Sequence, residues 1–205
     1  MDRTTHWQTV YATEPETTVS WYEAEPRHSL ALIGQAAPAA AASVIDVGGG
    51  ASTLVDHLLD AGHTDVAVLD ISANALERAR ARLGRRADRP AWIVADVTRW
   101  QPPRTWDIWH DRAVFHFLTD AADQDAYIAA LCAATAPGGF AILATFAADG
   151  PERCSGLPVR RYGQDDLARR LGPRFRLLTG LAVTHATPWA AEQRFTYALF
   201  RREPA

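Results

Sequence analysis

The sequence predicts an α/β protein that folds as a three-layer α/β/α sandwich around a mostly parallel sheet. Three observations predict it: short apolar runs alternate with segments of helical periodicity, the first run leads into a glycine turn, and two alternating segments close the chain. The first run is Val44–Val47, and the turn is Gly48, Gly49 and Gly50. A strand, a glycine turn and a helix form the first crossover of a doubly wound sheet, where such sheets bind nucleotide-like ligands.

Length and composition narrow the class of protein. The 205 residues suit one domain and leave no room for a second of similar size, and the net charge of -3 gives no field that would attract nucleic acid or an anionic membrane. Cys132 and Cys154 lack metal-ligand spacing, the first residues lack the apolar core of a signal peptide, and no apolar run has the length of a membrane span. We expect a cytoplasmic protein with reduced thiols, as a monomer or homodimer.

Residues 1–40 are expected to form an N-terminal helical or lid segment ahead of the single domain at 41–205. The segment is polar, yet it carries several large aromatic residues that must pack on something: Trp7, Tyr11, Trp21 and Tyr22. They belong either to a lid over the ligand or to a short helix packed against the edge of the sheet. The stretch Arg27–Ala37 predicts a helix that ends near Pro38.

The glycine turn indicates which nucleotide-like ligand to expect. A dinucleotide fingerprint would carry a third glycine where this chain has Thr53, which weakens the interpretation as a nicotinamide site. The pattern present is Asp46-x-Gly48-x-Gly50, an acidic residue inside the strand followed by two spaced glycines. Glycines permit positive φ and leave room for a ligand against the backbone. A tight structural turn with no ligand is the alternative.

Two more strands are predicted to end in acidic residues. Asp65–Asp70 is the second strand, and Asp70 lies 22 residues beyond Gly48, about the separation at which an acidic residue reaches a ribose diol. Its alternative role is to cap the following helix, Ala73–Leu83. The third strand, Ala91–Val97, contains Asp96, which alone would be read as a turn residue.

Together, Asp46, Asp70 and Asp96 at successive strand ends resemble the class I S-adenosylmethionine-dependent methyltransferases, here of the small bacterial single-domain type. The resemblance covers the chain from about Ser43 onward, although Ser52 stands where many members have a third spaced glycine. It implies a Rossmann-like fold whose seven-stranded sheet ends in an antiparallel hairpin. It also implies S-adenosylmethionine as cofactor and S-adenosylhomocysteine as product.

The same resemblance assigns the cofactor contacts. The glycine turn would pass under the amino-acid portion, Asp70 would bind the ribose, Asp96 would accept the adenine amino group, and the Val97 N–H would meet a ring nitrogen. The predicted cofactor set is completed by Gly49, Ile71, Asp111 and Trp21. The chain lacks the Asn-Pro-Pro-Tyr tetrapeptide of enzymes that methylate nucleic-acid amino groups, which counts against DNA adenine as the acceptor.

The fourth strand, Trp106–Arg112, leads into the segment where the acceptor is expected. His116 is the candidate general base, and Asp111 and Arg112 are the other catalytic candidates, Arg112 as a grip on an anionic group. The alternatives are a half-buried structural histidine and an Arg112 paired with Asp111 or Asp120. His110, Asp111 and His116 match no metal-site spacing, so we expect no metal.

The rest of the chain completes the sheet. A helix at Asp120–Ala136, with Cys132 in the core, is expected to end at the turn Pro137-Gly138-Gly139 before a fifth strand at Phe140–Phe146. The final hairpin is expected at Phe175–Thr184 and Arg194–Arg201, turning about Pro188-Trp189, after a short helix at Asp165–Leu171. In the loop 147–162, the residues that either line the substrate pocket or face solvent are Cys154, Arg160 and Arg161.

These parts predict an enzyme that transfers a methyl group from S-adenosylmethionine to a sulfur, nitrogen or oxygen of a small molecule. One alternative is methylation of a protein side chain such as lysine. Another, of a different class, is a domain that binds the cofactor without catalysis. We expect a small-molecule acceptor as partner, with no nucleic acid and no membrane.

Overall fold

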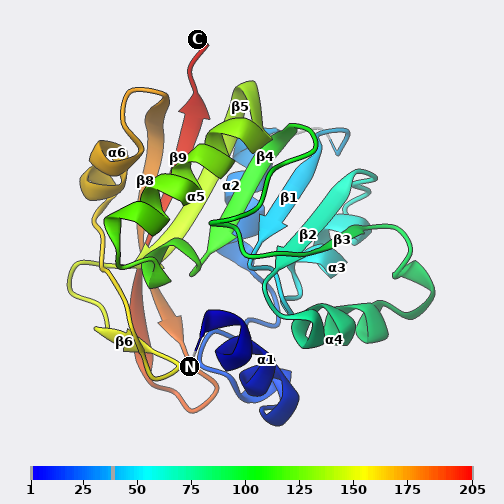
Figure 1. The fold of residues 1–205 in the computed structure, drawn as a ribbon. Helices are drawn as coiled ribbons and strands as arrows, with labels where there is room; N and C mark the ends of the chain where they lie inside the picture. Colours follow the sequence, from blue (N-terminus) through cyan, green and yellow to red (C-terminus); the bar gives the residue numbers. More distant parts are fainter. Residues whose placement is uncertain (1, 38–39, 205) are drawn as a thin grey trace.

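The computed structural model describes residues 2–37 and 40–204 and confirms the predicted α/β/α sandwich (Figure 1). One seven-stranded sheet has the order β3-β2-β1-β4-β5-β9-β8. The first five of these strands are parallel, and β9 and β8 continue the sheet as the antiparallel C-terminal hairpin. The strands are β1 Val44–Val47, β2 Val66–Asp70, β3 Ala91–Val94, β4 Trp106–Arg112, β5 Thr135–Phe146, β8 Phe175–Ala186 and β9 Glu192–Arg202. A separate small hairpin joins β6 Arg153–Cys154 to β7 Leu157–Pro158.

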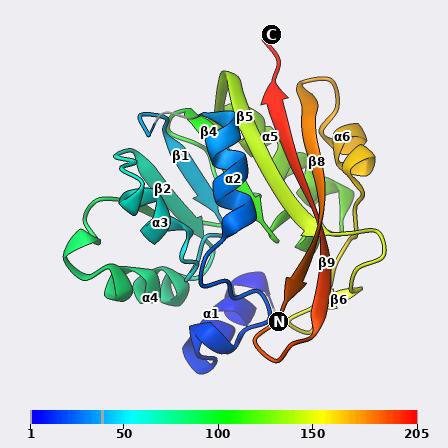
Figure 2. The ribbon, with the colours of Figure 1, turned by 180° about the vertical axis from the view of Figure 1, so that it is seen from behind.

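Helices cover both faces of the sheet. One face carries α2, α3 and α4, whereas α5 and α6 lie on the other, as the two opposite views show (Figures 1 and 2). The helices are α1 Arg3–Thr13, α2 Arg27–Ala36, α3 Leu54–Asp60, α4 Ala73–Leu83, α5 Ala121–Ala134 and α6 Gln164–Leu171. Short 3₁₀ turns are η1 Glu16–Thr18, η2 Gly84–Arg86 and η3 Phe115–Phe117.

The strand β1 lies at the centre because its side chains are apolar on both faces. Ile45 and Val47 belong to the apolar core under α5 and α6, whereas Val44 belongs to the core under α2, α3 and α4. All four of its residues are buried, which includes Asp46. Burial on both faces is what favours a continuous apolar run over an alternating one in a parallel sheet.

The predicted Pro-Gly-Gly turn is wrong in its position. The helix α5 ends earlier, at Ala134, and Pro137, Gly138 and Gly139 lie inside β5, where its register with β4 shifts. Gly138 adopts a φ of 77°, which favours glycine, and a Cβ on Gly139 would lie 2.8 Å from the Asp107 carbonyl oxygen. The glycines therefore serve a β-bulge rather than a helix end.

Other boundaries differ by a few residues. The strand β3 ends at Val94, so Asp96 and Val97 follow it in a loop instead of closing the strand. The helix α2 ends at Ala36, and Pro38 lies outside the described residues.

The N-terminal helix α1 lies across the carboxyl edge of the parallel strands (Figures 1 and 2). Gln8 fixes it to the start of α4, because its Oε1 accepts hydrogen bonds from Ser72 Oγ at 3.0 Å and from Asn74 N at 3.1 Å. An ion pair between Arg3 and Asp123 ties the helix to α5 as well. The helix thus lies over the strand ends rather than along the side edge of the sheet.

None of the helices in the described part of the chain combines the length and apolar character that crossing a membrane would require.

Candidate functional site

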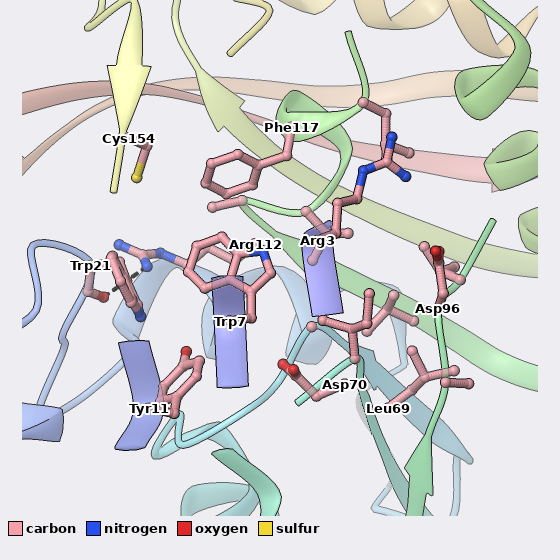
Figure 3. A pocket seen from close by; sticks show the side chains of 18 of the residues that line it. Arg3, Trp7, Tyr11, Trp21, Leu69, Asp70, Asp96, Arg112, Phe117 and Cys154 are labelled. Carbon is pink, nitrogen blue, oxygen red and sulfur yellow. Dashed lines mark hydrogen bonds between the residues drawn. The ribbon is translucent and has the colours of Figure 1, made fainter. Parts of the chain in front are cut away.

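A cavity of about 110 Å³ opens between the carboxyl edge of the sheet and α1 (Figure 3). The order of the strands divides its lining into two ends. The carboxylate end follows β2 and β3 and consists of Leu69, Asp70, Ile71, Ala95, Asp96 and Val97. The aromatic end lies toward β4, β5 and β9 and includes Trp7, Tyr11, Trp21, Arg112, Phe117, Phe146, Cys154, Gln193 and Phe195.

Asp70, the last residue of β2, reaches the carboxylate end while almost fully buried. Its Oδ1 accepts the Ser72 backbone N–H at 2.7 Å, and the cap of α4 is Ser72 itself, so Asp70 is not needed for capping. Burial, aided by the charge of Asp46, raises the pKa of Asp70 to about 7. Backbone hydrogen bonds from Ser72, Gly50 and Ile71 oppose this rise by favouring the ionised carboxylate, an acceptor that lines the cavity.

Asp96 and Val97 follow β3 and line the same end of the cavity. Asp96 is a turn residue, which was the alternative interpretation of this position. Its Oδ1 accepts hydrogen bonds from Thr98 N at 2.9 Å and from Thr98 Oγ1 at 2.7 Å. Both of these bonds use Oδ1, and Oδ2 takes part in neither. The turn therefore holds the carboxylate in place while leaving one oxygen for a ligand.

The glycine turn packs more tightly against the protein than the sequence suggested. Gly48 lines the cavity and has a φ of 68°, and a Cβ there would lie 1.9 Å from Val114 Cγ2. A Cβ on Gly49 would lie 2.5 Å from Asp46 Oδ2, and one on Gly50 would lie 3.0 Å from Asp70 Oδ2. Space for neighbouring side chains, as well as ligand approach, thus requires glycine at these positions.

Asp46 lies beneath the turn rather than in the main cavity. Its Oδ1 is 2.7 Å from His110 Nδ1, and His110 Nε2 is 2.8 Å from Ser29 Oγ, in a buried polar chain across β1, β4 and α2. Asp46 and Gly49 border an adjoining cavity of about 50 Å³, which Gly48 and Trp21 share with the main one. Two of the three predicted carboxylates therefore meet in one cavity, and the third lies next to it.

Asp111 does not reach either cavity, which contradicts its predicted place in the cofactor and catalytic sets. Its carboxylate is fully buried and accepts Val114 N at 2.8 Å, Phe115 N at 3.0 Å and the hydroxyl of Tyr127. These bonds hold the turn after β4, where Ala113 has a φ of 73°. Asp111 is thus a residue that positions the turn and has no side-chain oxygen turned to a ligand.

His116 is also placed where its predicted role as a general base does not fit. The ring is fully buried, lies outside the cavity lining and packs against Phe117 and Phe146. Its Nδ1 accepts the Phe146 N–H at 3.3 Å, so the neutral ring carries its proton on Nε2 and has no free lone pair to offer. Burial, together with the charge of Arg112, lowers the pKa of His116 to about 3.

Arg112, in contrast, borders both cavities. Its predicted alternative partners were Asp111 and Asp120, but its Nε lies 2.9 Å from the Tyr197 hydroxyl and 3.3 Å from Glu23 Oε2. Nη1 donates to the Trp21 carbonyl oxygen at 2.9 Å, whereas Nη2 is buried without a hydrogen-bond partner among the described residues. The arginine is therefore fixed by its neighbours and keeps one donor group unused.

The loop 147–162 contributes only part of what was expected. Cys154 lines the aromatic end, and burial raises the pKa of its thiol to about 11. Arg160 and Arg161 lie outside both cavity linings, so the solvated-loop alternative holds for them. Within residues 2–37 and 40–204, no three histidine, cysteine or acidic side chains gather as metal ligands would.

Several lining residues carry no signal in the sequence. Phe146, Gln193 and Phe195 come from β5 and the start of β9, and Phe117 comes from the turn after β4. Phe146 is the last residue of the predicted fifth strand, next to the fourth, and this position at a strand end could have marked it as a site residue. Gln193 and Phe195 depend on the register of the final hairpin, which the sequence leaves open.

Comparisons with known proteins agree with this geometry. Residues 44–139 match the family model described as "Methyltransferase domain". Among curated protein sequences, none matches the chain.

Solved structures resemble the whole chain. One is described as "Conversion of a Disulfide Bond into a Thioacetal Group during Echinomycin Biosynthesis" and has a TM-score of 0.79 at 19% identity, covering 98% of this chain and 92% of that chain. The N-methyltransferase NodS from Bradyrhizobium japonicum WM9, in complex with S-adenosyl-L-homocysteine, has a TM-score of 0.74 at 16% identity, covering 98% and 99%. The 1,6-didemethyltoxoflavin-N1-methyltransferase from Burkholderia thailandensis has a TM-score of 0.74 at 19% identity, covering 98% and 87%. At these identities the likeness concerns the fold.

Proposed function

Because the chain belongs to the class I S-adenosylmethionine-dependent methyltransferases, we propose that it methylates a small-molecule nucleophile. The observation that supports the small-molecule proposal is that α1 forms one wall of the cavity. Trp7 on this helix lines the cavity, and its ring centroid lies 5.1 Å from that of Phe117 and 5.7 Å from that of Trp21. These rings pack edge to face and form an apolar wall of the cavity, which is the kind of lining typical of small-molecule sites.

The carboxylate end suits the adenosine part of the cofactor. We propose that Asp70 binds the ribose hydroxyls, that Ile71 borders the same subsite, and that Asp96 and the Val97 backbone bind the adenine edge. The acidic lining at this end favours hydroxyl and amino donors and disfavours the phosphates of a dinucleotide. Gly48 and Gly49 then lie where the chain passes from this end toward Asp46 and the adjoining cavity.

The aromatic end suits the reacting group. When bound, S-adenosylmethionine supplies a methyl group on a cationic sulfonium. The faces of Trp7, Trp21 and Phe117 favour a cation and exclude water from it. The chain's main task is to hold the acceptor in line with the methyl group, because such a displacement depends chiefly on proximity and orientation.

The experiment that tests the proposal follows labelled methyl groups. The protein is incubated with methyl-labelled S-adenosylmethionine and fractionated cell extract, with the variant Asp70→Ala as the matched control. We expect label to enter the small-molecule fraction, and much less with the variant. Label found only in protein would favour side-chain methylation, and label in neither fraction would contradict the proposal.

A small acceptor agrees with one of the similar structures, the 1,6-didemethyltoxoflavin-N1-methyltransferase, which acts on a small molecule. We propose that the residues of the aromatic end alone decide which acceptor binds and which of its atoms takes the methyl group.

A further inference from the structure

The helix α1 has little apolar packing of its own. Within this helix, which the structure describes in full, Tyr11 alone is buried. Tyr11 belongs with Ala51 and Ala75 to a small cluster apart from the two main cores, and Trp7 and Trp21 pack against that cluster. Trp7, Tyr11 and Trp21 also line the cavity (Figure 3). Because an element with few buried apolar contacts has a low local stability, the position of α1 depends on its polar bonds and on what occupies the cavity.

Gln8 supplies polar bonds between α1 and the start of α4. Its Oε1 accepts hydrogen bonds from Ser72 Oγ and from Asn74 N, and its backbone carbonyl oxygen accepts one from Asn74 Nδ2 at 3.0 Å. All three bonds therefore use Gln8 as an acceptor, through oxygen atoms that a glutamate would also present.

Ser72 connects Gln8 to Asp70. A hydroxyl group has one hydrogen to donate, and that of Ser72 goes to Gln8 Oε1, while the same oxygen accepts the Ala75 N–H at 3.2 Å as the cap of α4. The Ser72 backbone N–H donates to Asp70 Oδ1 at 2.7 Å. Ser72 thus bonds to α1 through its side chain and to a carboxylate of the cavity lining through its backbone.

Tyr11 brings α1 close to the other oxygen of the same carboxylate. A Cβ on Gly50 would lie 3.0 Å from the Tyr11 hydroxyl oxygen and 3.0 Å from Asp70 Oδ2, so both oxygen atoms border the same point of the glycine turn. Burial, aided by the charge of Asp70, raises the pKa of Tyr11. Asp70 is therefore connected to α1 at Oδ1, through Ser72 and Gln8, and lies near α1 at Oδ2.

From these contacts we infer that Gln8 is a positioning residue, which couples the docking of α1 to Asp70 so that α1 and the bound cofactor hold each other in place. A cofactor bound to Asp70 fixes this carboxylate, and the bonds through Ser72 and Gln8 then fix α1. With α1 docked, the cofactor leaves only after the helix has undocked. The inference rests on the proposed function, because it concerns how the same cofactor is retained.

The rate at which S-adenosylhomocysteine dissociates tests the inference. Labelled compound is chased with an excess of unlabelled compound at about pH 8.5, above the pKa of about 7 at Asp70, so that this carboxylate is ionised. Gln8→Leu removes the side-chain acceptor, and we expect dissociation to become about tenfold faster. The control is Thr9→Ala, because the exposed Thr9 hydroxyl bonds to Thr5 O within the same helix. Dissociation from Gln8→Leu at the unaltered rate would overturn the inference.

Gln8→Glu separates the hydrogen bonds from packing. Glutamate has the length of glutamine and keeps an oxygen that can accept from Ser72 Oγ and Asn74 N, so dissociation should stay within about twofold of the unaltered rate. If Gln8 served packing alone, glutamate and leucine would change the rate alike, and that result would overturn the positioning role.

Hydrogen exchange tests the coupling in the opposite direction, because coupling between two sites is mutual. S-adenosylhomocysteine should slow amide exchange in α1 of the unaltered protein and of Thr9→Ala, and should slow it much less in Gln8→Leu. Equal protection in all three proteins would overturn the role of Gln8. If the unaltered protein failed to bind S-adenosylhomocysteine at all, the proposed function itself would fail, a result distinct from faster dissociation or lost protection.

Discussion

The two ends of the cavity differ in how the chain builds them. The carboxylate end comes from residues that directly follow neighbouring strands, and local hydrogen bonds such as that from Ser72 N to Asp70 fix each carboxylate. The aromatic end gathers residues from α1, from the turn after β4 and from β9, which lie far apart in the sequence. Substitutions far from the carboxylate end should therefore alter it little. The aromatic end, which is assembled from distant segments, depends on the packing of the whole domain.

Gly48 lies at the junction of the two ends, and its replacement should have the largest effect. In Gly48→Ala the new Cβ would lie 1.9 Å from Val114 Cγ2 at a φ of 68°, so both the turn and its neighbour must shift. We expect a loss of about 3 kcal/mol in the free energy of unfolding, measured by urea denaturation. Gly84→Ala is the matched control, since Gly84 has a φ of 56° with nothing within 4 Å of a Cβ. Equal losses in the two variants would show that strain alone, not packing, requires glycine at position 48.

Asp70 tests the carboxylate end by itself. Asp70→Ala removes a buried carboxylate that we assign to the ribose hydroxyls, and affinity for S-adenosylhomocysteine should fall about a hundredfold. Calorimetry measures the change, with Asp88→Ala, an exposed aspartate on the loop before β3, as the control. An unaltered affinity in Asp70→Ala would refute the ribose assignment.

The pH dependence of binding sharpens the same assignment. The pKa of Asp70 in the folded protein, about 7, is raised above its ordinary value. Protonation of Asp70 therefore stabilises the folded protein at low pH, and this contribution to the free energy of unfolding is lost as the pH rises through about 7. If the ribose hydroxyls bind the ionised form, binding at about one pH unit below this pKa should release close to one proton. Calorimetry in buffers of different ionisation enthalpy measures that proton. Release that persists in Asp70→Asn would assign the proton to another group.

His116 should show the smallest effect. His116→Phe replaces a neutral buried ring by one of similar shape, and the rate of methyl transfer to the labelled small-molecule fraction should stay within about twofold of the original. A loss of transfer with cofactor affinity retained would restore His116 as a base. Phe200→Leu, at a buried ring outside both cavity linings, shows how much a change of packing alone alters the rate.

The sequence was sufficient for the fold and for the carboxylate end, because both depend on local patterns. Helix α4 occupies Ala73–Leu83 and strand β1 occupies Val44–Val47, as predicted. The roles given to Asp111 and His116 failed for a physical reason. A residue at the end of a strand can point to the ligand or into the protein, and only the hydrogen bonds from Val114 N and Phe146 N show that these two point inward.

The aromatic end could not be predicted because its members share no motif. The sequence gives Trp7 and Trp21 no partner, and only the path of α1 across the strand ends shows that Trp7 packs against both Trp21 and Phe117. Gln193 gained its place from the pairing of β9 with β5, in which Phe195 lies opposite Phe146. Long-range register of this kind is set by the whole core.

The position of α1 also decides where the protein can be handled. Its first residue, Arg3, lines the cavity, whereas the chain closes along β9, where Arg201 pairs with Phe140 and Phe140 in turn pairs with Ile108 near the start of β4. An affinity tag or immobilisation linker fused ahead of Arg3 would therefore stand beside the cavity entrance. One attached after Arg202 would stand at the opposite rim of the sheet, which makes the carboxyl terminus the site for surface-coupled or fluorescent assays.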